Sequence, residues 1–177
     1  GAEVTSEGFH IYGLDPYQYY SAGYACYLSD IHTMQDSWDI WDNHMPITNV
    51  KNGQIIGYKY FGFGGLNQNK KGLKAFEGPG NNTKINLFLA PKTNKAFKIN
   101  IWLDGPWGNN AWRGRRIGQI TVPAGSAQTI TRFVANISSV VDHLDKKHAI
   151  YLVAESNVQE ILFDFAGLGF SSDKKKI

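Results

Sequence analysis

The fold is decided by the stretch Phe97-Lys98-Ile99-Asn100-Ile101-Trp102-Leu103, in which apolar residues occupy every second position. Period-two alternation over a segment of this length is the pattern of a half-buried β-strand. The alternating apolar set would face a core, whereas Lys98 and Asn100 would lie on the opposite side of the strand. One such strand needs partners, so the flanking sequence decides the architecture.

The same pattern recurs on both sides of this stretch, and clusters of Gly, Pro and Asn separate the segments. No helical segments alternate with them, which favours an all-β fold, a single β-sandwich, over a βαβ fold. The run Ala149–Ala154 is almost continuously apolar, as is typical of a central strand. The other expected strands lie around Ile56–Phe61, Ile85–Leu89, Ile120–Val122, Phe133–Ile137 and Ile161–Phe165.

Local details of this sandwich can also be predicted. Tyr58 and Tyr60 should share one face of their strand. The first 50 residues alternate poorly and predict one or two short strands and long loops packed across the sandwich. One segment, 138–147, predicts a short helix capped by Ser138 or Ser139, or equally a turn. Cys26 is the only cysteine, so it predicts a small buried hydrophobe and no internal disulfide.

The amino-acid composition limits the kinds of partner that this chain could bind. The 177 residues suffice for one domain with a sizeable core, and 14% aromatic with 19% charged residues suits a polar, uncharged surface. The net charge of +3 includes the run Lys174-Lys175-Lys176, which we expect to be a solvated tail. No basic stripe is interleaved with stacking aromatics, and no apolar run is long enough for a bilayer. We therefore expect neither a nucleic-acid partner nor membrane insertion.

The expected domain boundaries follow from these patterns. Residues 1–14, which open Gly1-Ala2-Glu3, should be a linker or a segment added for expression. Residues 15–171 should form the β-sandwich, and residues 172–177 the basic tail. We expect the chain to be a piece of a longer secreted, extracellular or cell-surface protein.

The connection after Leu103 is the most informative candidate site. It is rich in Gly, Asn and Pro and carries Trp107, Asn110, Trp112 and Arg113. A loop that only reverses direction does not need indoles, because a large apolar side chain left in water forgoes roughly 1.5–3 kcal/mol of burial. Flat rings stack on pyranose rings, while amide and guanidinium groups bond hydroxyls or a carboxylate. Either indole could instead fold back as a lid on the core.

The sequence carries no specific catalytic or metal motif. Asp104, Glu155, Glu160 and Asp164 are candidates for the carboxylate pair of a glycosidase, but they form no compact acidic motif. Glu160 and Asp164, four residues apart, would share a face if they lay on one strand. The histidines lack H-E-x-x-H spacing, and no G-x-S-x-G elbow or phosphate-binding loop is present.

Five segments stand in a recognisable order and spacing along the chain. They are Asp15-Pro16-Tyr17, Asn52-Gly53-Gln54-Ile55-Ile56-Gly57-Tyr58-Lys59-Tyr60-Phe61-Gly62-Phe63-Gly64, Ile99-Asn100-Ile101-Trp102-Leu103-Asp104-Gly105-Pro106, Ile117-Gly118-Gln119-Ile120-Thr121-Val122-Pro123 and His148-Ala149-Ile150-Tyr151-Leu152-Val153. Together they resemble family 6 carbohydrate-binding modules, most closely those that follow the catalytic domain of bacterial family 43 glycoside hydrolases. The resemblance covers about residues 15–170.

The resemblance implies a jelly-roll, galactose-binding-like β-sandwich that is not catalytic. Such modules hold an attached hydrolase near xylan, arabinoxylan or β-glucan. Their cleft lies in the loops at one end of the sandwich, and some members have a second on the concave sheet face. By position, Asp164 or a neighbour matches the family's polar ligand near the last strand.

Two departures from the family pattern stand out. The usual Glu-x-Glu that helps to hold a structural Ca²⁺ aligns with Ser21-Ala22-Gly23, so two of the usual carboxylates are absent. The resemblance thus implies a structural Ca²⁺ as the only cofactor, but this sequence lacks the usual carboxylate ligands for it. The segment 124–130 lacks the family's stacking tryptophan, so Trp107 or Trp112 would have to replace that wall.

The sequence therefore predicts a non-catalytic polysaccharide-binding module attached to a glycoside hydrolase. Trp107 and Trp112 would stack sugar rings, and Asn110, Arg113 and Asp164 would bond hydroxyls or a carboxylate. Trp38, Trp41 and Tyr58 are second-rank candidates, because such residues near strands are often core. A structural sandwich that braces a catalytic domain, and a small jelly-roll glycosidase or lyase, are the alternatives.

Overall fold

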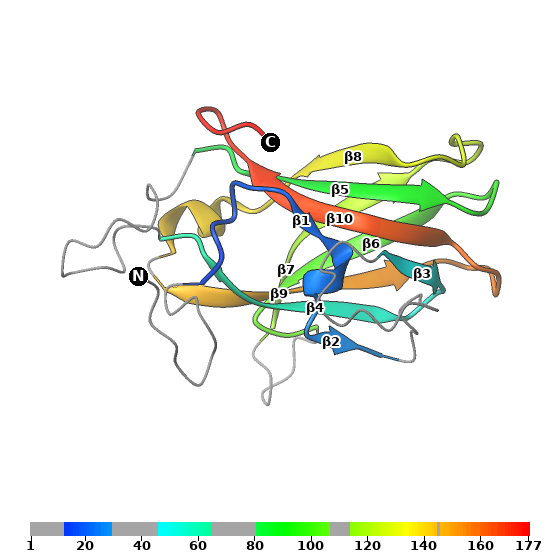
Figure 1. Cartoon of the computed structure of the whole chain (residues 1–177), viewed down its shortest axis with the longest axis horizontal. Coiled ribbons are helices and arrows are strands. Elements are labelled where there is room, and N and C mark those ends of the chain that lie inside the picture. Colours follow the sequence, from blue (N-terminus) through cyan, green and yellow to red (C-terminus); the bar gives the residue numbers. More distant parts are fainter. Residues whose placement is uncertain (1–12, 30–45, 65–80, 107–113, 145) are drawn as a thin grey trace.

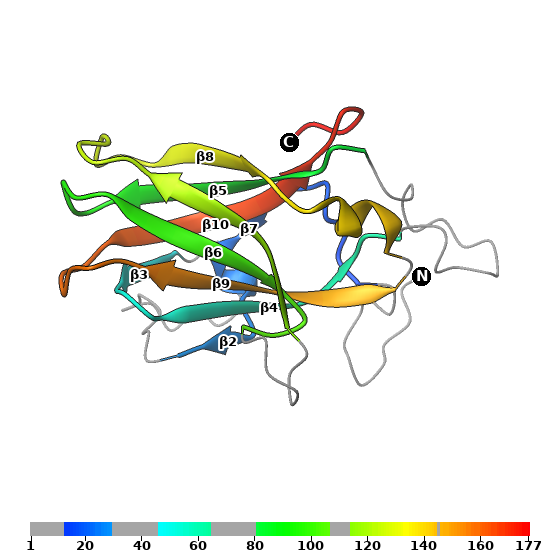
Figure 2. The same cartoon turned by 180° about the vertical axis from the view of Figure 1, so that it is seen from behind.

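The computed structural model describes residues 13–29, 46–64, 81–106, 114–144 and 146–177. Within these ranges the chain forms two antiparallel five-stranded sheets that pack face to face (Figures 1 and 2). The architecture confirms the predicted all-β sandwich. The described part contains no helix long and apolar enough to cross a membrane.

The strand order brings the first strand, β1, and the last strand, β10, side by side in one sheet. One sheet has the order β1 (Tyr20–Ser21), β10 (Phe163–Ser171), β5 (Lys84–Pro91) and β8 (Thr131–Asn136), and β3 (Ile47–Val50) also pairs with β10. The other has the order β2 (Tyr27–Leu28), β4 (Ile55–Gly62), β9 (Lys147–Glu155), β6 (Phe97–Leu103) and β7 (Arg115–Val122).

The alternation in β6 works as predicted, because Phe97, Ile99 and Ile101 are buried between the sheets while Lys98 is exposed. The apolar run of β9 lies between β4 and β6, which confirms the central position expected from its continuous apolar pattern. The last strand runs further than the pattern indicated, from Phe163 to Ser171, and does not include Ile161.

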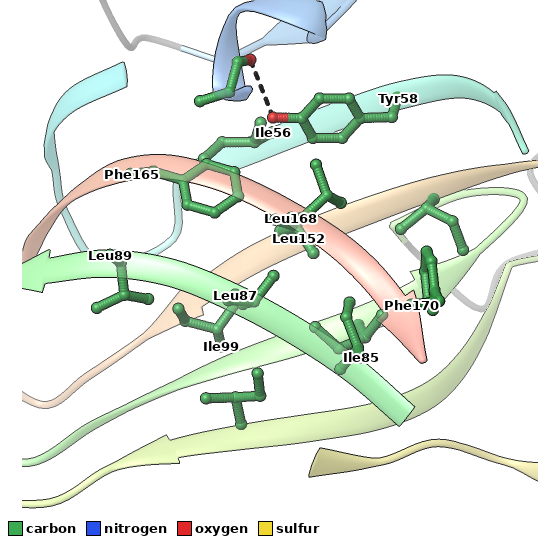
Figure 3. Close-up of a cluster of buried hydrophobic side chains, with 14 of the residues drawn as sticks. Ile56, Tyr58, Ile85, Leu87, Leu89, Ile99, Leu152, Phe165, Leu168 and Phe170 are labelled. Carbon is green, nitrogen blue, oxygen red and sulfur yellow. Dashed lines mark hydrogen bonds between the residues drawn. The ribbon is translucent and has the colours of Figure 1, made fainter. Parts of the chain in front are cut away.

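The core fills the space between the sheets with aliphatic and aromatic side chains (Figure 3). The rings of Phe97 and Phe163 stack across it with centroids 5.5 Å apart. Tyr58 is fully buried in this core, and its hydroxyl donates a hydrogen bond to the Ala22 carbonyl at 3.0 Å. A ring with no exposed surface cannot contact a glycan, so the expectation that Tyr58 binds sugar is wrong.

A register shift in β4 changes which side chains share a face. The pairing with β9 is irregular between Tyr58 and Phe61, so that both of these rings enter the core. Tyr60 consequently lies on the outer side, where it packs against the small cluster of Ile55, Ala149 and Tyr151. The predicted shared face of Tyr58 and Tyr60 is wrong, because strict period-two counting cannot follow an irregularity of this kind.

The predicted helix is a single 3₁₀ segment, η3 (Ser139–His143). Ser138 caps it as expected, since its hydroxyl accepts a hydrogen bond from the Val140 N–H at 3.3 Å. Val141 is buried and anchors the segment to the core. The described part of the first 50 residues holds three short strands, β1, β2 and β3, and the 3₁₀ turn η1 (Ala22–Tyr24), which is one strand more than predicted.

Two local expectations fail. Cys26 is exposed rather than buried, and it directly precedes the edge strand β2, with its N–H bonding the Gly57 carbonyl at 2.8 Å. The basic tail is not simply solvated. The Lys175 ammonium lies 5.9 Å from the centre of the Tyr17 ring, and the main-chain carboxylate of Ile177 accepts a hydrogen bond from Arg132 at 2.7 Å.

Candidate functional site

The outer surface of the sheet β2-β4-β9-β6-β7, named here the Trp102 face, carries a row of aromatic side chains. The register places Tyr27 opposite Gly57, Gly57 opposite Tyr151, Tyr151 opposite Trp102, and Trp102 opposite Arg116. Neighbouring strands lie about 4.8 Å apart, so the row from β2 to β6 spans roughly 14 Å. It therefore offers an elongated surface rather than a single point of contact.

Gly57 allows this row to lie flat against the sheet. A Cβ at this position would come within 2.6 Å of the Tyr151 ring, so only glycine lets that ring lie across β4. The Tyr27 ring meets Tyr151 edge-on, with centroids 6.2 Å apart and an interplanar angle of 70°. Burial raises the pKa of the Tyr151 hydroxyl, which keeps the phenol neutral.

The exposure of the rings decides which can meet a ligand. Tyr151 is only 4% exposed and forms a small buried cluster with Ile55 and Ala149. Trp102 and Tyr60 are partly buried against that cluster, and Tyr27 is 42% exposed. The outermost rings thus rest on a fixed apolar base, which holds them in place without burying them.

A network of amide and carboxylate groups lies beside the aromatic row. The Asn100 side chain donates to the Glu155 carboxylate at 3.2 Å and accepts from Gln119 Nε2 at 2.8 Å. Arg116 Nη1 also donates to the Asn100 oxygen, at 3.4 Å. Because Asn100 is only 9% exposed, it fixes the other three groups, which keep spare donors and acceptors for hydroxyls.

The connection predicted to bind sugar begins and ends beside this face. It leaves β6 after Leu103 and enters β7 at Arg115, and these two residues are cross-strand partners. Asp104 begins it with a φ of 69°, and its carboxylate lies 2.8 Å from His148 Nδ1. The predicted contact residues of this connection, Trp107, Asn110, Trp112 and Arg113, lie outside the described residues.

Asp164 does not lie with these groups. It sits at the start of β10, on the other sheet and at the end of the sandwich where β6 begins rather than ends. Its carboxylate lies 3.0 Å from the Lys92 ammonium and accepts the Asn49 N–H at 2.9 Å. The structure therefore does not join Asp164 to the ends of the Trp107–Arg113 connection. Trp38 and Trp41 lie outside the described residues.

The four carboxylates considered for catalysis do not form a pair, because each bonds different partners. They are Asp104, Glu155, Glu160 and Asp164. Glu160 lies before β10 and bonds the Thr93 hydroxyl, and the Lys95 ammonium lies 3.3 Å away. The Thr93 hydrogen bond lowers the pKa of the Glu160 carboxyl, with a smaller effect from Lys95. Glu160 and Asp164 do not share a strand, so the condition under which they would share a face is not met.

The segment aligned with the calcium ligands of the family does not fit that ion. Ser21 supplies one buried hydroxyl without a hydrogen-bond partner among the described residues, and Ala22 and Gly23 supply no side-chain oxygen. Ca²⁺ takes six to eight oxygens, usually including carboxylates. No cluster of three His, Cys, Asp or Glu side chains occurs in the described ranges.

The structure closely resembles solved sugar-binding domains. A family 6 carbohydrate-binding module from Clostridium cellulolyticum, in complex with xylose, is 22% identical with a TM-score of 0.62, covering 90% of this chain and all of that one. The CsCBM6-3 module of Clostridium stercorarium, in complex with cellobiose, is 18% identical with a TM-score of 0.59, covering 91% and 98%. The chain has the fold of the family 6 carbohydrate-binding modules.

A larger protein shares this fold in one part. A family 43 arabinoxylan arabinofuranohydrolase from Bacillus subtilis is 21% identical with a TM-score of 0.64, and the match covers 90% of this chain but only 28% of that one. No protein-family model matches the sequence, and no curated protein matches it. The fold thus confirms the resemblance to family 6 modules that the ordered segments indicated.

Sequence reasoning missed the residues that make the Trp102 face. The signal was available in β6, because the alternation that assigned Lys98 and Asn100 to the outer side also assigns Trp102 to it. Tyr60 could not be found this way, since the register shift in β4 reverses its side. Gln119 and Glu155 join the network only through strand pairing, which local alternation does not give.

Proposed function

We propose that this chain is a non-catalytic polysaccharide-binding module and that the Trp102 face holds a neutral glycan chain. The observation that carries the proposal is the in-register aromatic row beside the network around Asn100. The apolar C–H faces of sugar rings stack on flat aromatic rings, and amide and carboxylate groups bond the hydroxyls and set the orientation. Both kinds of group occur here on rigid strands.

The open shape of the face favours the interior of a polymer over its end. The row crosses four strands without a described element closing either side of it, so a chain could extend past both ends. Trp107, Asn110, Trp112 and Arg113 would add contacts where β6 and β7 meet their connection. Trp38 and Trp41 stay second-rank proposals, and no described contact supports a sugar-binding role for Asp164.

The glycan class and the setting of the module extend this proposal. Xylan, arabinoxylan and β-glucan are the expected ligands, since solved neighbours of this fold were obtained in complex with xylose and cellobiose. An attached glycoside hydrolase is supported by the occurrence of the fold within an arabinofuranohydrolase. The module would then act outside the cell, with residues 15–171 as the sandwich.

Binding of the intact chain to xylan, cello-oligosaccharides and mixed-linkage β-glucan, measured by affinity electrophoresis and calorimetry, tests the proposal. Trp102→Ala should lower affinity at least tenfold while the unfolding transition stays cooperative. Ile130→Ala is the matched control, because Ile130 is 66% exposed and lies outside this face. If Trp107→Ala and Trp112→Ala abolish binding and Trp102→Ala does not, the connection rather than the face is the site.

The same panel separates the alternatives. A module that only braces a catalytic domain would bind none of these glycans, whereas a glycosidase or lyase would release reducing ends from them. Either result would overturn the proposed function.

A further inference from the structure

The opposite side of the sandwich carries a second aromatic row. On the outer surface of the sheet β1-β10-β5-β8, named here the Tyr19 face, the register aligns Gly167 with Phe88 and Phe88 with Arg132. Tyr19, which directly precedes β1, lies over Gly167, where a Cβ would come within 2.5 Å of its ring. This face looks toward the viewer in Figure 1.

Tyr19 is held rigidly although it is exposed. Its hydroxyl donates a hydrogen bond to the Ala166 carbonyl at 3.1 Å, and its ring meets Phe88 edge-on with centroids 5.1 Å apart at 83°. Tyr19 is nevertheless 47% exposed, and Val134 on the same face is 48% exposed. A fixed, half-exposed ring can stack on a ligand without a further loss of side-chain entropy.

Arg132 connects this ring pair to a charged pocket. Its guanidinium lies 4.9 Å from the centre of the Phe88 ring, which fixes its plane. It also lines a pocket of about 200 Å³ and donates to the main-chain carboxylate of Ile177, which uses one of its five N–H groups. The remaining groups can form the paired hydrogen bonds that a carboxylate accepts.

The pocket has an excess of positive charge. Three cations, Lys84, Arg132 and Lys176, line it against two negative groups. One is the Asp173 carboxylate, which accepts a hydrogen bond from Asn82 at 2.7 Å, and the other is the main-chain carboxylate of Ile177, the last residue of this chain. Two hydroxyls add donors: that of Ser171 accepts from Asn86 and so keeps its own proton to give, and that of Ser172 is buried without a described partner. The complementary ligand is an anion with adjacent oxygens.

The size of the pocket narrows that ligand further. A volume of about 200 Å³ is below the roughly 300–1,000 Å³ of pockets that enclose a whole small molecule. It accepts a substituent such as a carboxylate, while the ring that bears it remains outside. Arg132 lines the pocket and also contacts the Phe88 ring, so the Tyr19–Phe88 pair lies beside the pocket. The sugar ring that bears the carboxylate would rest on this pair.

We propose that the Tyr19 face is a second glycan-binding surface, selective for uronic-acid units whose carboxylate enters the Arg132 pocket. Tyr19 stacks on the sugar ring, and Arg132 and Lys84 bind the carboxylate. Because this face and the Trp102 face lie on opposite sides of the sandwich, one molecule can hold a neutral and an acidic chain together. The inference does not depend on sugar binding at the Trp102 face.

Binding of the full chain to polygalacturonate, with methyl-esterified polygalacturonate as the matched uncharged probe, tests this proposal in affinity gels and by calorimetry. Arg132→Gln and Tyr19→Ala should each weaken binding of polygalacturonate at least tenfold, and the methyl ester should bind tenfold more weakly than the acid. Lys84→Gln should weaken it severalfold. Trp102→Ala should leave it unchanged, so failure at one face does not imply failure at the other.

Lys174→Gln is the matched control, since it removes one positive charge outside the pocket. Equal losses for Lys174→Gln and Lys84→Gln, or equal binding of dextran sulfate, would show unspecific attraction to polyanions and overturn the proposal. Wild-type affinity of both Tyr19→Ala and Arg132→Gln would overturn it as well. Reversible turbidity in a mixture of xylan and polygalacturonate, absent with either variant, would support simultaneous binding.

Discussion

The two outer faces of the sandwich share one arrangement of aromatic rings and differ in the polar groups that surround it. On each face a tyrosine ring lies over a glycine of a paired strand, at Gly57 and at Gly167, and further in-register aromatics extend it toward an arginine. On the Trp102 face the tyrosine is 4% exposed and supports other rings, whereas Tyr19 is 47% exposed and is itself the outermost ring.

The polar surroundings differ more than the rings do. Beside Trp102, amides and one carboxylate form a mutually bonded network around Asn100, which suits neutral hydroxyls. Beside Phe88, three cations surround a small pocket, which suits an anionic substituent. An aromatic row therefore identifies a face that could stack sugars, but only its polar neighbours distinguish one glycan class from another.

The largest expected effect is a loss of stability, and it should be greater when alanine replaces Gly167 than when it replaces Gly57. Gly167→Ala places a methyl group 2.5 Å from the Tyr20 carbonyl oxygen, which belongs to the backbone and cannot rotate away. We expect a loss of about 3 kcal/mol in the free energy of unfolding, measured with denaturant. Gly57→Ala meets mainly the Tyr151 ring, which can shift, so we expect roughly 1–2 kcal/mol and a larger relative loss of neutral-glycan binding.

This comparison is wrong if Gly57→Ala is the more destabilising variant. It is also wrong if Gly57→Ala leaves binding of xylan unchanged, because the displaced Tyr151 ring supports Trp102.

The next effect tests whether the polar network on the Trp102 face is a fixed unit. Asn100→Ala removes the hydrogen-bond partner that Glu155 and Gln119 share, at a cost of about 0.5–1.5 kcal/mol in the free energy of unfolding for each hydrogen bond lost. Asn136→Ala, on the exposed edge strand β8, should stay within about 0.5 kcal/mol. Equal melting temperatures for the two variants would contradict the network.

A smaller effect concerns the carboxylate that sequence comparison proposed as a ligand. Asp164→Asn removes an ion pair with Lys92 whose lysine side chain is 43% exposed, so we expect less than about 1 kcal/mol of destabilisation. High salt should reduce the difference between variant and wild type. If Asp164→Asn loses xylan binding while its fold stays intact, Asp164 does contribute to the glycan site. The Trp102 face would then not be the whole site for neutral glycans.

The fold could be predicted from the sequence because alternation is local and strong in most strands. The pattern of β6 alone separates the buried Ile99 from the outer Asn100, and the apolar run of β9 indicates its central place. The site could not be predicted in the same way, because its residues come from strands that meet only through pairing. Gln119 joins Asn100 across β6 and β7, and Tyr60 reaches the outer face only through the irregular register of β4.

The smallest expected effect is a dependence of stability on pH through the Glu160 carboxyl group, which lies outside both faces. The hydrogen bond from Thr93 holds the pKa of Glu160 below its ordinary value, so the folded state binds this proton less readily than the unfolded state does. The resulting stabilisation is present above the unfolded pKa of about 4.3 and is lost as the pH falls through the lower folded value. Glu160→Gln should therefore lower the melting temperature slightly at pH 7, and in scanning calorimetry this difference should shrink as the pH is lowered. A difference that persists at low pH would mean that the variant disturbs packing rather than this ionisation. Xylan and polygalacturonate binding should be unaffected at neutral pH, so any change in either would connect this end of the sandwich to one of the two faces.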